Sequence, residues 1–220
     1  MQYLKVNSNT KLSKADQRGY MIAHFSLPAI ETCPSAGACK IGCYATQGNY
    51  RYPSVVKSYR NNLELTKDVQ SFMESMRLDL EAFERKALRA KLIPAVRIHT
   101  SGDFYSKEYL YAWIGLICMH PGIQFYAYTK QLPLVRKAPK PVNLTLIFSE
   151  GGIHDSSISL TDRHARVFSS RDELVQSGYD DASDDDTVAF LSESGKIGLL
   201  YHGAARRAWS TNTQAEVKTA

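Results

Sequence analysis

Three of the four cysteines in this chain lie within one short loop, and no other feature of the sequence is better suited to chemistry. Cys33, Cys39 and Cys43 occur in TCPSAGACKIGCYATQGNYRY (32–52) with C-x5-C-x3-C spacing, whereas Cys118 is remote. In a reducing compartment, clustered cysteines bind metal or react more often than they form disulfides. The spacing therefore predicts a metal centre with Cys33, Cys39 and Cys43 as its ligands.

The same spacing favours an iron–sulfur cluster over a zinc ion. Structural zinc sites take four ligands, typically in close pairs, and this loop contains no C-x2-C pair. In a [4Fe-4S] cluster each thiolate binds a separate iron, so three cysteines leave one iron open to an unidentified small molecule. Loss of that iron on oxidation gives a [3Fe-4S] cluster. A zinc ion and three simply packed thiols remain the alternatives.

Cys118 lies near the end of an apolar segment, YAWIGLICMHPG. Free cysteine is among the most buried residue types, so we expect a small buried thiol there. The alternative is that Cys118 is a fourth cluster ligand, which would close the cluster and indicate an electron-transfer or structural role.

Short apolar and β-branched runs predict strands that alternate with helices. The expected strands are 21–29, 94–100, 123–129, 143–149, 165–170 and 187–192, and the expected helices are 69–92, 106–119 and 171–176. Alternation of this kind is typical of parallel βαβ units. The chain has 220 residues, fewer than a full eight-stranded barrel typically needs. We therefore expect a single α/β domain over residues 1–220, built as a partial or six-unit parallel β/α barrel, with an open parallel sheet as the alternative.

Polar residues directly follow the first four predicted strands. The cysteine loop (32–45) comes after the first, and HTSGDFYS, YTK and SEGG come after the next three. Parallel strands end at one edge of a sheet, where α/β proteins place their sites. We therefore expect a further set of side chains to line the site: His99, Ser101, Asp103, Tyr128, Lys130 and Glu150. The alternatives are a core position for His99, a helix cap for Asp103 and a surface position for Lys130.

Composition indicates a globular chain with a real core. Hydrophobic residues make up 44% and charged residues 22%. The sequence has no apolar run approaching the ~18 residues of a membrane span. The amino-terminal segment MQYLKVNSNTKLSK lacks the apolar core of a signal peptide. We expect a cytoplasmic protein with no membrane partner.

The charge is mildly positive and unevenly distributed, with a formal net charge of +5. The segment GNYRYPSVVKSYRNN (48–62) interleaves tyrosines with Lys and Arg, a pattern that can stack bases and neutralise phosphates. The outer face of a helix explains it more simply, so a nucleic-acid partner is not favoured. The acidic run DDASDDD (180–186) is expected to be a solvated loop.

Five ordered motifs carry a resemblance to a known family. They are SNTKLSK, HFSLPAIETCPSAGACKIGCYATQGNYRY, NNLEL, VRIHTSGDFYS and FYAYTK, between about residue 7 and residue 130. Together they resemble the phage-encoded gene product 88 family, which implies a protein of the host cell cytoplasm. Many members carry further cysteines near the carboxyl terminus, whereas FLSESGKIGLLYHGAARRAWS (190–210) has none. The resemblance thus implies a member with a single cluster.

The loop ending in Cys43-Tyr44-Ala45 is also similar to that of phage proteins considered relatives of radical SAM enzymes. This likeness implies a radical-SAM-like fold, S-adenosylmethionine on the open iron, and its methionine amine near Ser101 to Asp103. Radical SAM loops are usually C-x3-C-x2-C, and both gaps are longer here.

Three kinds of function remain open from the sequence. The first is a radical-SAM-like enzyme, with catalytic residues that the sequence does not identify. The second is a non-enzymatic redox or structural iron–sulfur protein. The third is a zinc-stabilised nucleic-acid-binding protein.

Overall fold

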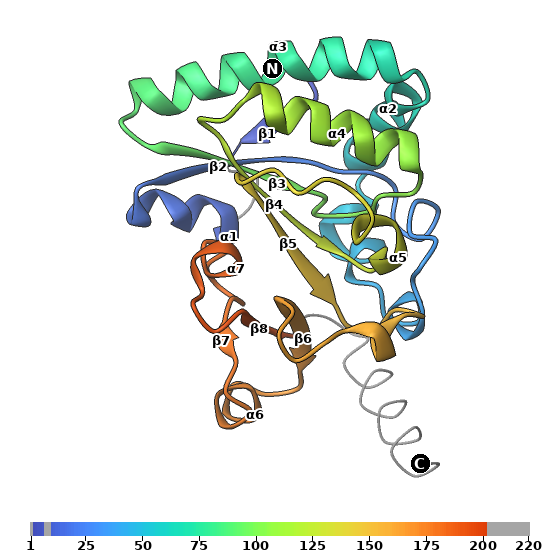
Figure 1. The fold of residues 1–220 in the computed structure, drawn as a ribbon, viewed down its shortest axis with the longest axis vertical. Coiled ribbons are helices and arrows are strands. Elements are labelled where there is room, and N and C mark those ends of the chain that lie inside the picture. The colour runs from blue at the N-terminus through green and yellow to red at the C-terminus, as the bar shows by residue number, and fades with distance from the viewer. Residues whose placement is uncertain (1, 7–9, 202–220) are drawn as a thin grey trace.

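The computed structural model describes residues 2–6 and 10–201, which form a β-sheet with helices packed against it (Figure 1). The strands are β1 (Lys5–Val6), β2 (Tyr20–Phe25), β3 (Ile93–Ile98), β4 (Gln124–Thr129), β5 (Leu144–Ser149), β6 (His164–Phe168), β7 (Asp180–Asp181) and β8 (Lys196–Leu200). Their order across the sheet is β1-β2-β3-β4-β5-β6-β8-β7. All neighbouring pairs are parallel except β1 and β2. The strands β2 to β6 and β8 therefore lie side by side in chain order.

The helices are mostly connections between these strands. The α-helices are α1 (Thr10–Ser13), α2 (Pro53–Thr66), α3 (Val69–Arg89), α4 (Lys107–Met119), α5 (Leu132–Val135), α6 (Arg171–Gln176) and α7 (Val188–Leu191). Single 3-10 turns are η1 (Lys14–Arg18), η2 (Ala38–Lys40), η3 (Tyr44–Thr46), η4 (Gly48–Arg51) and η5 (Asp155–Ser157). Among the described residues, no helix combines the length and apolar character that crossing a membrane requires.

Local sequence explains where the longest helices begin. The Asp68 carboxylate accepts hydrogen bonds from the first backbone N–H groups of α3, those of Gln70 and Ser71. Ser106 caps α4 in the same way by accepting from the Tyr109 N–H. α2 instead begins with a proline, Pro53, whose missing N–H would have no helical partner at that position. The expected helices 69–92, 106–119 and 171–176 are confirmed as α3, α4 and α6.

Five of the six predicted strands are confirmed, as β2, β3, β4, β5 and β6, and the sixth is wrong. Residues 187–192 contain the short helix α7, and the last long strand of the sheet is β8. The Asp185 side chain accepts from both the N–H and the hydroxyl of Thr187, which starts the helical turn. A short apolar run does not by itself distinguish a buried strand from a buried helix.

Both faces of the sheet are covered (Figure 1). On one face α3 and α4 bury an aromatic cluster in which Phe25, Phe72 and Trp113 have ring centroids 5.5–5.7 Å apart. On the other face the amino-terminal segment and α7 contribute Leu12 and Ala189 to a second buried cluster. The described pairings run from β1 to β7 and do not join these two strands, so the expected barrel is not confirmed.

A buried carboxylate holds the second face together. Asp186 is completely buried and accepts from Lys11 Nζ at 2.8 Å and from Arg97 at 2.9 Å. The Tyr126 hydroxyl donates to the same carboxylate. Burial alone would raise the pKa of Asp186, but the Arg97 and Lys11 cations outweigh it and hold the pKa well below its usual range. The expectation that 180–186 is a solvated loop is therefore wrong: Asp180–Asp181 form β7, Ala182 and Ser183 are buried, and Asp186 balances two inward-facing cations.

Removing that charge should destabilise the fold. Asp186→Asn leaves two cations without their common partner, and breaking a buried ion pair in this way costs about 3–5 kcal/mol. Urea denaturation followed by circular dichroism measures the loss. The matched control is Asp184→Asn, because Asp184 has an exposed side chain that pairs with Arg171 at the surface. Equal midpoints for the two variants would contradict the structural role of Asp186.

The buried His24 should make stability depend on pH. Its Nδ1 lies 3.0 Å from Ser26 Oγ, and burial, reinforced by the Arg97 charge, lowers the His24 pKa to about 4. Between pH ~6.5, the pKa of an unfolded histidine, and pH 4 the unfolded chain binds a proton that the folded chain excludes. The free energy of unfolding should therefore fall by about 1.4 kcal/mol per pH unit from this group as pH drops through that window. Denaturation of His24→Asn should lack this contribution, and parallel pH profiles for parent and variant would contradict it.

Candidate metal centre

The cysteine loop lies between β2 and α2 and is fastened to the segment that follows β5. The backbone N–H groups of Gly37 and Cys39 both donate to the Gly151 carbonyl at 3.1 Å. A side chain at Gly37 would begin 2.9 Å from the Gly152 carbonyl carbon, closer than Cβ atoms normally come. The close approach of the two backbones therefore requires a glycine at position 37, and it fixes the loop over the carboxyl ends of the parallel strands.

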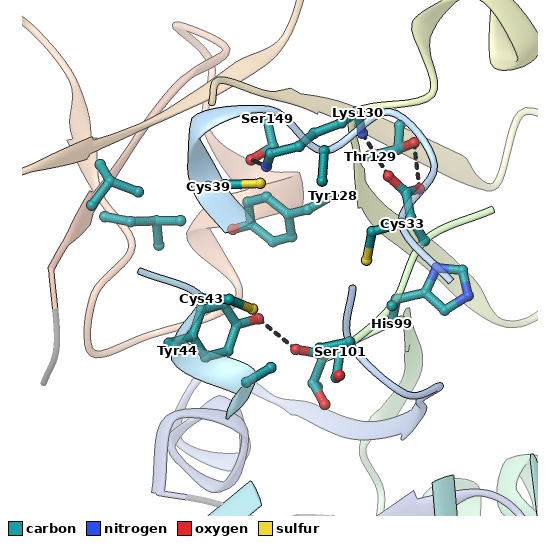
Figure 2. Close-up of a pocket in the computed structure, with 18 of the residues that line it drawn as sticks. Cys33, Cys39, Cys43, Tyr44, His99, Ser101, Tyr128, Thr129, Lys130 and Ser149 are labelled. Atoms are coloured by element: carbon teal, nitrogen blue, oxygen red, sulfur yellow. Dashed lines mark hydrogen bonds between the residues drawn. The ribbon is translucent and has the colours of Figure 1, made fainter. Parts of the chain in front are cut away.

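Cys33, Cys39 and Cys43 line one cavity of about 180 Å³ (Figure 2). Its other walls come from residues at the ends of β3, β4 and β5, so the predicted convergence at one sheet edge is what the structure shows. All three thiols are free of disulfides. Among the described residues, no three His, Cys, Asp or Glu side chains form a group that could hold a metal ion. The three thiols therefore line the same cavity without being grouped around a single point.

The environment of Cys33 and Cys43 favours the protonated form of both thiols. Burial, with the Asp103 charge as a second cause, raises the pKa of Cys33 to about 12. Burial also raises the pKa of Cys43. A coordinating thiol loses its proton, so binding a metal here would release protons. Sulfur donors of this kind suit zinc, copper(I) and iron–sulfur clusters, so the type of donor is compatible with the predicted cluster and its zinc alternative alike, although no three donors among the described residues are grouped around one ion.

Asp103 and Ser101 lie at the cavity and connect its walls. The Asp103 carboxylate accepts from the Phe104 N–H at 2.7 Å, the Thr129 hydroxyl at 2.7 Å and the Lys130 N–H at 2.8 Å. It therefore ties the end of β3 to the end of β4, while Ser106 rather than Asp103 caps α4. Ser101 Oγ donates to the Leu27 carbonyl and joins the loop after β2 to the loop after β3.

His99 is a buried residue and also a cavity-lining one. Its backbone has φ +69°, a left-handed conformation that is uncommon for a residue other than glycine. Its Nε2 lies 2.8 Å from the Tyr109 hydroxyl, and its Nδ1 has no hydrogen-bond partner among the described residues. Burial, with the Arg97 charge, lowers the His99 pKa to about 3, so the ring is neutral. His99 therefore occupies a core position and lines the cavity as well, the two positions that the sequence left open for it.

Another wall of the cavity is formed by the cationic side chains of Arg97 and Lys130 and the phenol of Tyr128. Lys130 Nζ donates to Ser149 Oγ at 2.7 Å and has no carboxylate within ion-pair distance in the described part of the chain. The Arg97 guanidinium lies 4.8 Å from the centre of the Tyr128 ring. The Tyr128 hydroxyl is buried and has no hydrogen-bond partner among the described residues. Glu150 also lines the cavity, but Arg166 pairs with it at 2.7 Å.

The sequence interpretation missed Arg97 and Tyr44. Arg97 is a charged residue inside a buried strand, which is a signal in itself, but its partner Asp186 lies 89 residues further along the chain. Tyr44 immediately follows a predicted ligand, and its hydroxyl donates to the Thr100 carbonyl, which joins the cysteine loop to the end of β3. Both residues line the cavity.

Cys118 lies on the outer layer of the fold. It is exposed near the end of α4, so the expectation of a buried thiol is wrong. The apolar content of α4 exceeds what one buried face needs, which leaves Cys118 and Met119 in solvent. Cys118 is not among the residues that line the cavity.

Comparison with known proteins identifies relatives of this chain. It is 32% identical over 126 residues to the Gene 88 protein of Mycobacterium phage D29, which covers 54% of this chain and 51% of that protein. It is 34% identical over 103 residues to the Gene 88 protein of Mycobacterium phage L5, a match that covers 45% of this chain and 43% of that protein. The chain thus matches about half the length of each relative. No solved structure matches it. The family described as Gene product 88 matches residues 3–217, and the chain belongs to that family.

Proposed function

We propose that this chain is an iron–sulfur protein that holds one [4Fe-4S] cluster through Cys33, Cys39 and Cys43. The observation that carries the proposal is that these three thiols line one cavity at the edge where the parallel strands end. A single metal ion needs ligands that converge on one point, whereas the thiolates of a cluster bind separate irons. Three thiols that line one cavity therefore suit a cluster better than a single ion. When bound, the cluster would supply electron transfer or an open iron that takes a ligand.

The charge around the cavity supports an anionic occupant. A cluster bound by three thiolates is negative overall, and Lys130, which has no carboxylate partner among the described residues, provides a cation beside it, whereas Arg97 is balanced by Asp186. The two lining carboxylates are already engaged, Asp103 by three donors and Glu150 by Arg166. His99 is neutral because of its lowered pKa. The side chains that remain available to an incoming group are therefore mainly hydrogen-bond donors.

A radical-SAM-like enzyme is the more specific candidate. It is favoured by six parallel strands that lie side by side in chain order, with the cysteine loop directly after the first of them. We propose that these strands correspond to a partial β/α barrel and that S-adenosylmethionine would bind beside the open iron. In that arrangement Lys130 would bind the carboxylate, while Asp103 would act chiefly by holding two loops in place. The non-enzymatic redox or structural protein is the second candidate, and a zinc-stabilised nucleic-acid-binding protein is the third.

Metal analysis of anaerobically purified protein tests the cluster. We expect several irons per chain, a comparable amount of acid-labile sulfide and a brown colour. Cys33→Ser, Cys39→Ser and Cys43→Ser should each abolish the cluster, because each removes one thiolate of the set. The matched control is Cys118→Ser, which should retain it because Cys118 is exposed on α4. Stoichiometric zinc without sulfide would contradict the proposal, as would loss of the cluster from the control.

Titration of S-adenosylmethionine into the reduced protein distinguishes the enzyme from the redox or structural protein. Electron paramagnetic resonance follows the cluster, and binding at the open iron should shift the spectrum. The shift should need about tenfold more ligand in Lys130→Gln, since a charge-assisted hydrogen bond is worth roughly 1.5–3 kcal/mol. Lys137→Gln, at an exposed position, is the control. A well-formed cluster with an unchanged spectrum would contradict the enzyme and leave the redox or structural role.

A further inference from the structure

A series of tyrosine rings in contact with one another starts at the cavity. Tyr44 lines the cavity, yet 49% of its surface is exposed. Its ring packs edge-on against Tyr50 with centroids 5.6 Å apart, and Tyr50 lies 6.3 Å from Tyr59 on α2. Tyr52 stands just before α2 and is 59% exposed. Three phenol rings thus form a contacting series that starts at the cavity, and Tyr52 adds an exposed ring in the same segment of the chain.

The segment that carries these tyrosines is basic. The sequence has no Asp or Glu between residues 32 and 63, a stretch that contains Lys40, Arg51, Lys57 and Arg60. All four cations are exposed. Only Arg60 forms an ion pair within the described residues, with Glu31. On α3, by contrast, Arg77 pairs with a glutamate of the same helix. Lys40, Arg51 and Lys57 therefore have no ion-pair partner among the described residues, whereas Arg60 has one.

We propose that this face, formed by residues 40–60 of the cysteine loop and α2, binds single-stranded nucleic acid. Unpaired cations neutralise phosphates, and exposed aromatic rings stack on bases without regard to sequence. Bases of a single strand offer their faces to such rings, whereas bases of a duplex are stacked on one another. An acidic protein could satisfy the cations, but its carboxylates would make no use of the tyrosines. The strand would cross the mouth of the cavity, because Tyr44 belongs to both.

The inference goes beyond the proposed function, and the face does not need a cluster to bind. Its cations and rings belong to side chains outside the set of three cysteines. Measuring iron in the same samples separates the two ideas. A preparation without iron that still binds the strand would support the nucleic-acid face and count against the cluster.

Fluorescence polarisation of a labelled 20-nucleotide oligodeoxythymidine, titrated with the full chain over a range of salt concentrations, tests the charge. Arg51→Glu combined with Lys57→Glu should weaken binding at least tenfold. It should also reduce the slope of log K against log salt by roughly 0.7 for each phosphate that is no longer neutralised. The matched control is Lys86→Glu combined with Arg89→Glu, two exposed cations at the far end of α3 (Figure 1). Equal weakening in both double variants, or in neither, would overturn the proposal.

A second pair of variants tests the stacking. Tyr52→Ala should weaken binding about fivefold or more with the salt slope unchanged, because stacking involves no counterion release. Tyr111→Ala is the control, since Tyr111 is 40% exposed on α4, outside this face. Unlabelled single strand should compete far better than a duplex of the same length. A duplex that competes equally well, or a Tyr52→Ala protein that binds like the control, would overturn the single-strand assignment. Circular dichroism checks that all four variants are folded.

Discussion

The ion network of Asp186 is the constraint on which both the fold and the site depend. One completely buried carboxylate engages Lys11 from the amino-terminal segment, Arg97 from β3 and Tyr126 from β4. Burying Arg97 without that partner would cost about 3–5 kcal/mol, a large fraction of the stability of an ordinary domain. With it, the guanidinium can lie under the Tyr128 ring and donate to the His99 carbonyl. The floor of the cavity is therefore set by a charge pair whose anion lies near the carboxyl end of the described chain.

The cavity walls differ in how firmly they are built. The walls after β3 and β4 are joined by the Asp103 carboxylate, whose three donors come from both loops. The wall that carries the cysteines consists of short 3-10 turns, which separate hydrogen bonds join to the surrounding loops, among them those of Ser35, Gly37 and Tyr44. Binding of a metal group by three thiols would add its free energy to this wall. The strand ends, by contrast, are fixed without it.

Much of the sheet and its edge could be predicted from sequence, because the signals are local. Apolar runs bounded by polar turns located β2 to β6, and apolar residues at three- and four-residue steps located α3. Convergence of the site residues followed from parallel strands alone. Residues 187–192 were predicted as a strand because the apolar run is too short to show which period it follows. Cys118 was predicted to be buried because α4 has more apolar residues than its buried face holds. Arg97 and Asp186 could not be paired from sequence, since their contact joins residues 89 positions apart.

The inner and outer surfaces of the cysteine loop require different kinds of residue. Its inner surface requires small residues and close backbone approach, as Gly37 against Gly152 illustrates. Its outer surface carries Lys40, Tyr44 and Arg51, whose side chains project into solvent. Tyr44 joins the two, because its hydroxyl binds the Thr100 carbonyl while its ring remains half-exposed beside Tyr50. A single strand that stacked on the ring would therefore contact a side chain that is hydrogen-bonded to the cavity wall, so the proposed outer face and the cavity share Tyr44.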